Sequence, residues 1–205
     1  MGRTLIEELL NEFLNDLPVM LAAGLVYWFV RRHLTKKRFG DDFKEVRRGT
    51  MLNNIIGLLL VMWAALIVCS TLLPSWDFLI KWGFGFHLIP HWKLFPELII
   101  RIIRYGDFGT YHELLNVLMF VPIGLAIPFM LNRPNFKMSV FFGFCFTFKI
   151  EYLQGFLGQR DGNIDDLICN TLGVIGGYLL FLLMKLILPK FTAKCMIKAS
   201  DQGVI

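Results

Sequence analysis

Charged residues are scarce in this sequence. Asp, Glu, Lys and Arg together make up 18% of it, whereas a typical soluble domain has about 25%. Apolar residues account for 56%, and the mean hydropathy is +0.58. This composition excludes an ordinary soluble domain, and the polar interruptions exclude a single membrane anchor. We therefore predict a protein with several membrane-spanning helices.

The motifs of cofactor and metal chemistry are also missing. The four cysteines form no C-x-x-C pair, so neither a disulfide framework nor a zinc site is indicated. His87 and His91 have the spacing of helical metal ligands, but Pro90 between them breaks a regular helix, so we expect no metal site. The sequence has neither a Gly-rich phosphate loop nor a serine or cysteine nucleophile in a recognisable motif. No cofactor is expected.

Several stretches approach the length of a membrane-spanning helix, about 17 to 25 mostly apolar residues. Four of them do so on their own: residues 55–73, 113–131, 138–157 and 166–188. A further candidate, residues 17–30, is short, but apolar residues recur at helical spacing just before it. That preceding segment suits an interfacial helix or an extension of the first span. We predict an all-α membrane helix bundle of about five spans, with residues 1–205 as a single domain.

The distribution of cations predicts how the bundle is oriented. Residues 31–49 contain eight lysines and arginines, so this loop should be cytoplasmic. The N-terminus is then outside and the C-terminus inside, with residues 189–205 as a cytoplasmic tail. The net charge of +5 is explained by loops that face anionic lipid, and no nucleic acid partner is expected. The opening 16 residues hold one arginine and four acids, unlike a signal peptide, so no cleaved leader is expected.

Residues 76–104, between the second and third predicted spans, are rich in Trp and Phe and contain Pro90 and Pro96. Amphipathic rings with interspersed cations are stable in the outer headgroup region, which favours an interfacial segment. The two prolines also suit a re-entrant hairpin. Both alternatives stay open at this point.

Polar residues converge from three predicted spans. Helical spacing gives each pair one face and a common depth near the outer surface: Glu113 and Asn116, Glu151 and Gln154, and Asp166 and Asn170. The last face continues as Gly173 and Gly177, a G-x-x-x-G pair that lets another helix approach closely. An isolated carboxylate in hydrocarbon costs several kcal/mol. Acids at this depth therefore indicate a functional site.

Two cations are candidates to meet these acids. Arg160 has the planar fork that suits a carboxylate or a phosphate. Lys149 lies two residues from Glu151 and points to another side of the same helix, where it must meet another helix or a ligand, or snorkel along its own helix. The candidate ligand-binding residues are therefore Glu113, Asn116, Lys149, Glu151, Gln154, Arg160, Asp166 and Asn170.

Some of these polar residues also have simpler explanations. Asp165 opens a predicted helix and suits the capping of that helix. Asn116 and Asn170 suit hydrogen bonds between helices, which are a common use of amides in membranes. For the two amides, this structural role and ligand binding are equally well supported.

Three stretches resemble the VanZ-like family of bacterial membrane proteins. They are "FHLIPHWKLF", "NVLMFVPIGLAIPFM" and "IEYLQGFLGQRDGNIDDLICNTLGVIGGYLL", which lie within residues 86–180. The chain departs from the family in "RDGNIDD", where R-S-F-D-I-D-D is common, so that Asn163 replaces a usual Asp. Lys149 also stands where a small or apolar residue is usual. The resemblance implies a multi-pass protein of the bacterial plasma membrane, and the family's namesake is associated with low-level resistance to teicoplanin, a glycopeptide antibiotic with a lipid tail.

Three functions fit these observations. The leading hypothesis is a cell-envelope protein that binds an amphiphile at the outer leaflet: a lipoglycopeptide, a polyprenyl-linked cell-wall intermediate or a phospholipid headgroup. The second is a membrane enzyme that modifies such a lipid, with Glu151 or Asp166 as general base. The third is a lipid flippase with Glu151 as proton carrier. The inner halves of the last three spans offer almost no polar groups for such a path.

Overall fold

A computed structural model describes residues 5–39, 50–72, 90–106, 111–131, 134–157 and 161–196. Some of the sequence predictions fall outside this described part. They concern Arg160, residues 40–49 of the basic loop, residues 73–89 of the aromatic segment and the tail beyond residue 196.

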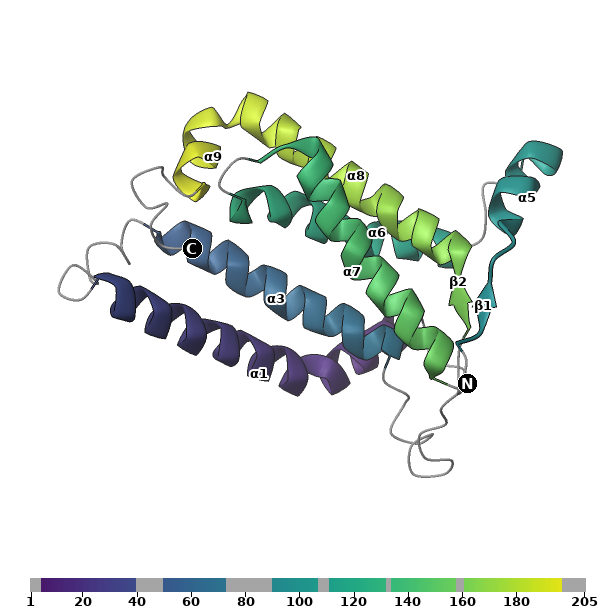
Figure 1. Ribbon diagram of the computed structural model, residues 1–205, viewed down its shortest axis with the longest axis horizontal. Helices are drawn as coiled ribbons and strands as arrows, with labels where there is room; N and C mark the ends of the chain where they lie inside the picture. Colours follow the sequence, from purple (N-terminus) through teal and green to yellow (C-terminus); the bar gives the residue numbers. More distant parts are fainter. Residues whose placement is uncertain are drawn as a thin grey trace.

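The described chain is almost entirely helical, which confirms the all-α prediction (Figure 1). The long helices are α1 (Leu5–Phe39), α3 (Met51–Leu72), α6 (Tyr111–Met130), α7 (Phe136–Phe156) and α8 (Ile164–Ile187). The short elements are β1 (Trp92–Lys93), α5 (Glu97–Tyr105), β2 (Gly162–Asn163) and α9 (Pro189–Cys195). The long helices lie side by side and alternate in direction, and α1 packs against α3 at one edge of the bundle.

Four described helices are long and apolar enough to cross a membrane: Phe13–Lys37, Met51–Leu72, Tyr111–Met130 and Ile164–Ile187. A multi-span membrane protein is therefore supported. Helix α7 has 21 residues but does not belong to this set, because Lys149, Glu151 and Gln154 interrupt its apolar sequence. The count of five spans stays a prediction. Helix α1 is continuous from Leu5, so the segment before the first predicted span belongs to the same helix as that span.

Helices α6 and α8 form the tightest contact of the bundle. A Cβ atom added at Gly124, Gly173 or Gly177 would collide with a backbone carbonyl oxygen of the facing helix. Only glycine permits this approach, since any side chain would push the two backbones apart. The predicted role of the G-x-x-x-G pair is thus confirmed, and it fixes the first turns of α6 beside those of α8.

The interior of the bundle is apolar between its two ends. We call one group of buried residues the central apolar layer: Ile67, Phe120, Ile123, Ile127, Ile150 and Val174. It joins α3, α6, α7 and α8. A second group, Phe129, Tyr178, Phe181 and Cys195, packs further along α6 and α8 and includes α9. The buried carboxylates therefore lie towards one end of the bundle, whereas the buried hydroxyl of Thr147 lies midway along α7.

A short parallel strand pair joins the aromatic segment to the connection between α7 and α8. Trp92 pairs with Gly162, and Lys93 pairs with Asn163. The backbone N–H of His91 donates to the carbonyl of Gly155 at 2.9 Å, and that of Gly162 donates to the carbonyl of His91 at 3.0 Å. Helix α5 follows and projects beyond the end of the bundle (Figure 1). The described part of the aromatic segment is thus a strand and a short helix at one end of the bundle.

Candidate functional site

Six of the predicted site residues lie on α6, α7 and α8 towards the end of the bundle where α6 and α8 begin and α7 ends; Figure 1 shows these helix ends side by side. We call this group the polar cluster: Glu113, Asn116, Glu151, Gln154, Asp166 and Asn170. The deepest members are almost inaccessible, with Glu151 2% exposed and Asn170 3% exposed. The structure therefore brings these six predicted residues to one end.

The first turns of α6 and α8 are joined by a hydrogen bond within the polar cluster. Asn116 Nδ2 donates to Asp166 Oδ1 at 2.8 Å. Glu113, one turn earlier on α6, forms an ion pair with Arg101 of α5. Arg101 was not among the predicted site residues. The alternation of Arg101 and Arg104 with isoleucines in "ELIIRIIRY" was the available signal, because it marks an amphipathic helix with a cationic face.

Glu151 lies at the end of α7 beneath the start of α8. Its Oε2 accepts a hydrogen bond from the backbone N–H of Asn163 at 3.0 Å. The side chain of Asn163 accepts in turn from the N–H of Asp165 at 3.0 Å and caps α8. Asparagine is as good an N-cap as aspartate, so the departure from the common family sequence at this position keeps the cap.

Asp165 caps a different helix from the one that the sequence indicated. Its Oδ2 accepts from the backbone N–H of Leu98 at 3.0 Å, in the first turn of α5. Helix α8 already has Asn163 as its cap. The prediction that Asp165 caps its own helix was therefore wrong. Sequence rules for helix caps consider only neighbouring residues, whereas tertiary structure brings the start of α5 to Asp165. The second carboxylate oxygen, Oδ1, is buried with no hydrogen-bond partner among the described residues.

The amides of the polar cluster connect helices. Asn170 Nδ2 donates to Thr147 Oγ1 of α7 at 2.8 Å, and Gln154 Nε2 donates to the carbonyl of Thr71 at 3.0 Å, near the end of α3. The predicted interhelical role of amides is thus present. Asn170 Oδ1 is nevertheless buried, and within the described part of the chain it accepts no hydrogen bond.

The remaining two predicted site residues do not join this group. Lys149 is exposed on the outer surface of α7, as are its neighbours Phe148 and Leu153. Arg160 lies outside the described residues. At the rim of the bundle, Asp161 lies 3.8 Å from Lys93 and 4.0 Å from His91. Within the described ranges, no three His, Cys, Asp or Glu side chains are placed to hold a metal ion.

The opposite end of the bundle contains a buried polar residue that sequence reasoning missed. Asn53 of α3 is 1% exposed. Its Nδ2 donates to the carbonyl of Phe129 at 2.6 Å and to that of Cys195 at 3.1 Å. These carbonyls lie at the ends of α6 and α9, where no intrahelical partner is available. An asparagine in the apolar stretch "MLNNIIGLLL" was the only signal.

Four apolar helices of membrane-spanning length indicate a multi-pass helical membrane protein, and its buried carboxylates lie at one end of the described bundle. A family model, VanZ/LLP1, matches residues 56–185, well over half of the chain. The chain belongs to the VanZ/LLP1 family, as the sequence resemblance indicated. Comparisons with curated proteins and with solved structures found no match.

Proposed function

We propose that this VanZ-type membrane protein binds an amphiphile of the bacterial cell envelope at the polar cluster, in the outer leaflet of the plasma membrane. The proposal includes five spans, with the N-terminus outside and the C-terminus inside. The topology supports the fifth span, and the charges support the orientation. The buried acceptors support ligand binding, and the central apolar layer favours binding over transport.

The fifth span would be α7. Helices α6 and α8 both begin at the end that holds the polar cluster, so the chain must return along the bundle between Met130 and Ile164. Helix α7 makes this return with 21 residues, which at about 1.5 Å per residue is close to the thickness of the hydrocarbon core.

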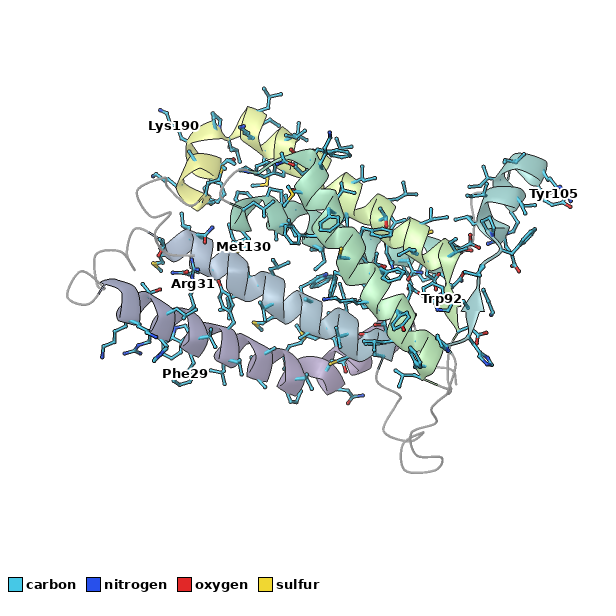
Figure 2. All side chains as sticks on the ribbon, viewed as in Figure 1. Phe29, Arg31, Trp92, Tyr105, Met130 and Lys190 are labelled. Atoms are coloured by element: carbon cyan, nitrogen blue, oxygen red, sulfur yellow. The ribbon has the colours of Figure 1, made fainter. Side chains whose placement is uncertain are left out.

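The charges support the orientation. The end opposite to the polar cluster carries many cations, of which Arg31 and Lys190 are labelled in Figure 2. Those in the described residues are Arg31, Arg32, Lys36, Lys37, Lys137, Lys185, Lys190 and Lys194. No acid is found in the described residues at this surface: the part of α1 after Trp28, the start of α7, the end of α8 and α9. Such an excess of cations is typical of the cytoplasmic side.

The observation that carries the binding proposal is the set of buried carboxylates and amides at this end, Glu151, Gln154, Asp165 and Asn170, two of which have an acceptor oxygen without a donor among the described residues. Asp165 Oδ1 and Asn170 Oδ1 accept no hydrogen bond from any described residue. An unsatisfied buried acceptor is costly, more so when it is charged. Hydroxyl or ammonium groups of a ligand headgroup would satisfy such acceptors. The neighbouring carboxylates of the polar cluster favour the same chemistry, and Arg160 would attract a phosphate.

The central apolar layer favours binding over transport. Phe120 and Val174 lie one helical turn deeper than Asn116 and Asn170, and both are fully buried. A headgroup that enters the polar cluster therefore meets tightly packed apolar side chains below it. A flippase would need polar groups along a continuous path, and these residues provide none.

The family suggests the kind of ligand. Its namesake is associated with resistance to teicoplanin, whose lipid tail would stay in the membrane while its polar part met the cluster. A polyprenyl-linked cell-wall intermediate or a phospholipid has the same division into headgroup and chain. We propose a role in glycopeptide resistance that works through such an amphiphile.

Lipid mass spectrometry on the gently purified protein tests the proposal. Glu151→Gln is the informative variant, because glutamine keeps an oxygen that can accept from the N–H of Asn163. We expect an amphiphile bound to the wild type and lost from Glu151→Gln at equal membrane abundance. Glu97→Gln makes the same change at an exposed position and should keep the ligand.

Other outcomes would contradict the proposal in different ways. Loss of abundance together with the ligand would indicate that the polar cluster is structural. Retention of the ligand by Glu151→Gln would remove that residue from the site. A chemically altered lipid in cells with the wild type, absent with Glu151→Gln, would instead support the enzyme hypothesis.

A further inference from the structure

Helix α7 has two chemically different faces. Its buried face is small or polar and includes Ser139, Gly143, Thr147 and Glu151. Its exposed face is aromatic and includes Phe141, Phe144, Phe148 and Tyr152. The polar cluster uses only the buried face, so the exposed face remains to be explained.

The exposed face carries a continuous row of rings that we call the aromatic ladder: Phe144, Phe148, Tyr152 and Phe156. Successive ring centroids are 6.1, 6.1 and 5.1 Å apart. Trp92 of β1 packs beside the row, with its ring centroid 6.0 Å from that of Phe148. Residues four apart on a helix lie above one another, so the ladder follows the helix axis for three turns.

Lys149 lies beside this ladder on the same exposed side. It is exposed and adjoins Tyr152 and Leu153, which are three and four residues further along the helix. No described residue forms an ion pair or hydrogen bond with it in the structure. It stands eight residues before Leu157, which places its Cα about 12 Å below the end of the helix. A charged group at that depth in hydrocarbon is unfavourable without a partner.

We propose that Lys149 and the aromatic ladder bind an anionic phospholipid of the outer leaflet. The ammonium group snorkels towards the membrane surface and binds the lipid phosphate, while the acyl chain lies along the rings. This surface faces away from the polar cluster, because Lys149 and Glu151 are two residues apart and point to different sides of α7. The inference rests on α7 being a membrane span, but not on ligand binding at the polar cluster.

Native mass spectrometry on the full-length protein tests this inference. The protein is exchanged into nanodiscs with equal amounts of phosphatidylglycerol and phosphatidylcholine, and retained lipid is measured after transfer to detergent. We expect the wild type to retain phosphatidylglycerol preferentially. Loss of one charge-assisted contact in Lys149→Gln should lower its occupancy about tenfold. Lys149→Arg should retain the lipid, and Phe148→Leu should show a smaller loss.

Lys137→Gln is the matched control, because Lys137 is an exposed lysine at the other end of the same helix. It should retain phosphatidylglycerol like the wild type. Equal occupancy in the wild type and Lys149→Gln would overturn the inference, and so would an equal loss in Lys137→Gln, which would indicate general attraction to cations. Glu151→Gln should keep phosphatidylglycerol whatever happens to the ligand of the polar cluster, so the two proposals can fail separately.

Discussion

The buried polar side chains at the two ends of the bundle differ in charge. At the polar-cluster end, carboxylate and amide oxygens accept from backbone N–H groups, as Asp165 does from Leu98 and Glu151 does from Asn163. At the other end, the amide of Asn53 donates to the carbonyls of Phe129 and Cys195. Both arrangements follow from the polarity of helix ends, since N-termini present donors and C-termini present acceptors.

Both ends have a buried acceptor that no described residue satisfies: Asn53 Oδ1 at one end, and Asp165 Oδ1 and Asn170 Oδ1 at the other. The Asn53 amide group uses both of its protons on carbonyls of two helices, which is a contribution to stability. Among the described residues, buried carboxylates occur only at the polar-cluster end, as Glu151 and Asp165. We infer that the two ends differ in charge: the Asn53 end has a neutral amide that joins helices, whereas the polar-cluster end has buried carboxylates that suit a ligand with hydroxyl or ammonium groups.

Asn53→Asp should produce the largest effect on this comparison. A carboxylate in place of the amide has no proton to donate, so it would face two carbonyl oxygens in a buried site. We expect a loss of about 3 kcal/mol in unfolding free energy, measured by thermal unfolding in detergent. Asn54→Asp is the control, because Asn54 Oδ1 accepts from Arg31 Nε at 3.0 Å and a carboxylate can do the same. If both variants were equally stable, the role assigned to Asn53 would be wrong.

Gly177→Ala should weaken the close contact between α6 and α8, which aligns these two helices along the bundle. The added Cβ would fall on the carbonyl oxygen of Val121 and lie 2.6 Å from the backbone N of Leu125. Overpacking of this kind costs about 2 kcal/mol, and unfolding curves should show the loss. At Gly176 the same substitution would meet only a side-chain atom of Val121, at 3.9 Å, and should be tolerated. Equal losses at both positions would contradict close packing at Gly177 as the cause, since alanine is the better helix former at either position.

Asp165→Ala should have the smallest and most local effect. It removes the side chain that caps α5, which costs about 1 kcal/mol, and hydrogen exchange in residues 97–105 should quicken while the rest of the bundle is unchanged. Asp161→Ala removes an exposed aspartate and should leave exchange in α5 as in the wild type. Global unfolding of the Asp165 variant would show that this end is as integral to stability as the Asn53 end.

The sequence predicted that six polar residues lie towards one end of the bundle because only helix geometry was needed. Span direction and a rise of about 1.5 Å per residue set the depth of Glu113, Glu151 and Asp166. The same periodicity predicted that Lys149 and Glu151 face different sides. These inferences use short-range rules that tertiary structure does not alter within a continuous helix.

The partners of those residues could not be predicted in the same way. Arg101 and Leu98 belong to α5, whose position depends on the pairing of β1 with β2, a contact between segments about 70 residues apart. No periodicity encodes such a pairing. Asn53 was missed for a related reason: an amide at the start of an apolar stretch is typical of a loop boundary, and its two acceptors come from distant helix ends.

The bonds of Asn53 also impose an order on biosynthesis. Asn53 precedes Phe129 by 76 residues and Cys195 by 142 residues. At about 5–20 residues per second, roughly 7 to 28 seconds pass between the synthesis of Asn53 and that of its last partner. Until then one amide proton of Asn53 lacks the carbonyl partner that it has in the folded protein, because that partner belongs to α9, the last of the described helices. The hydrogen bonds of Asn53 are thus complete only after residue 195 of 205 has been made.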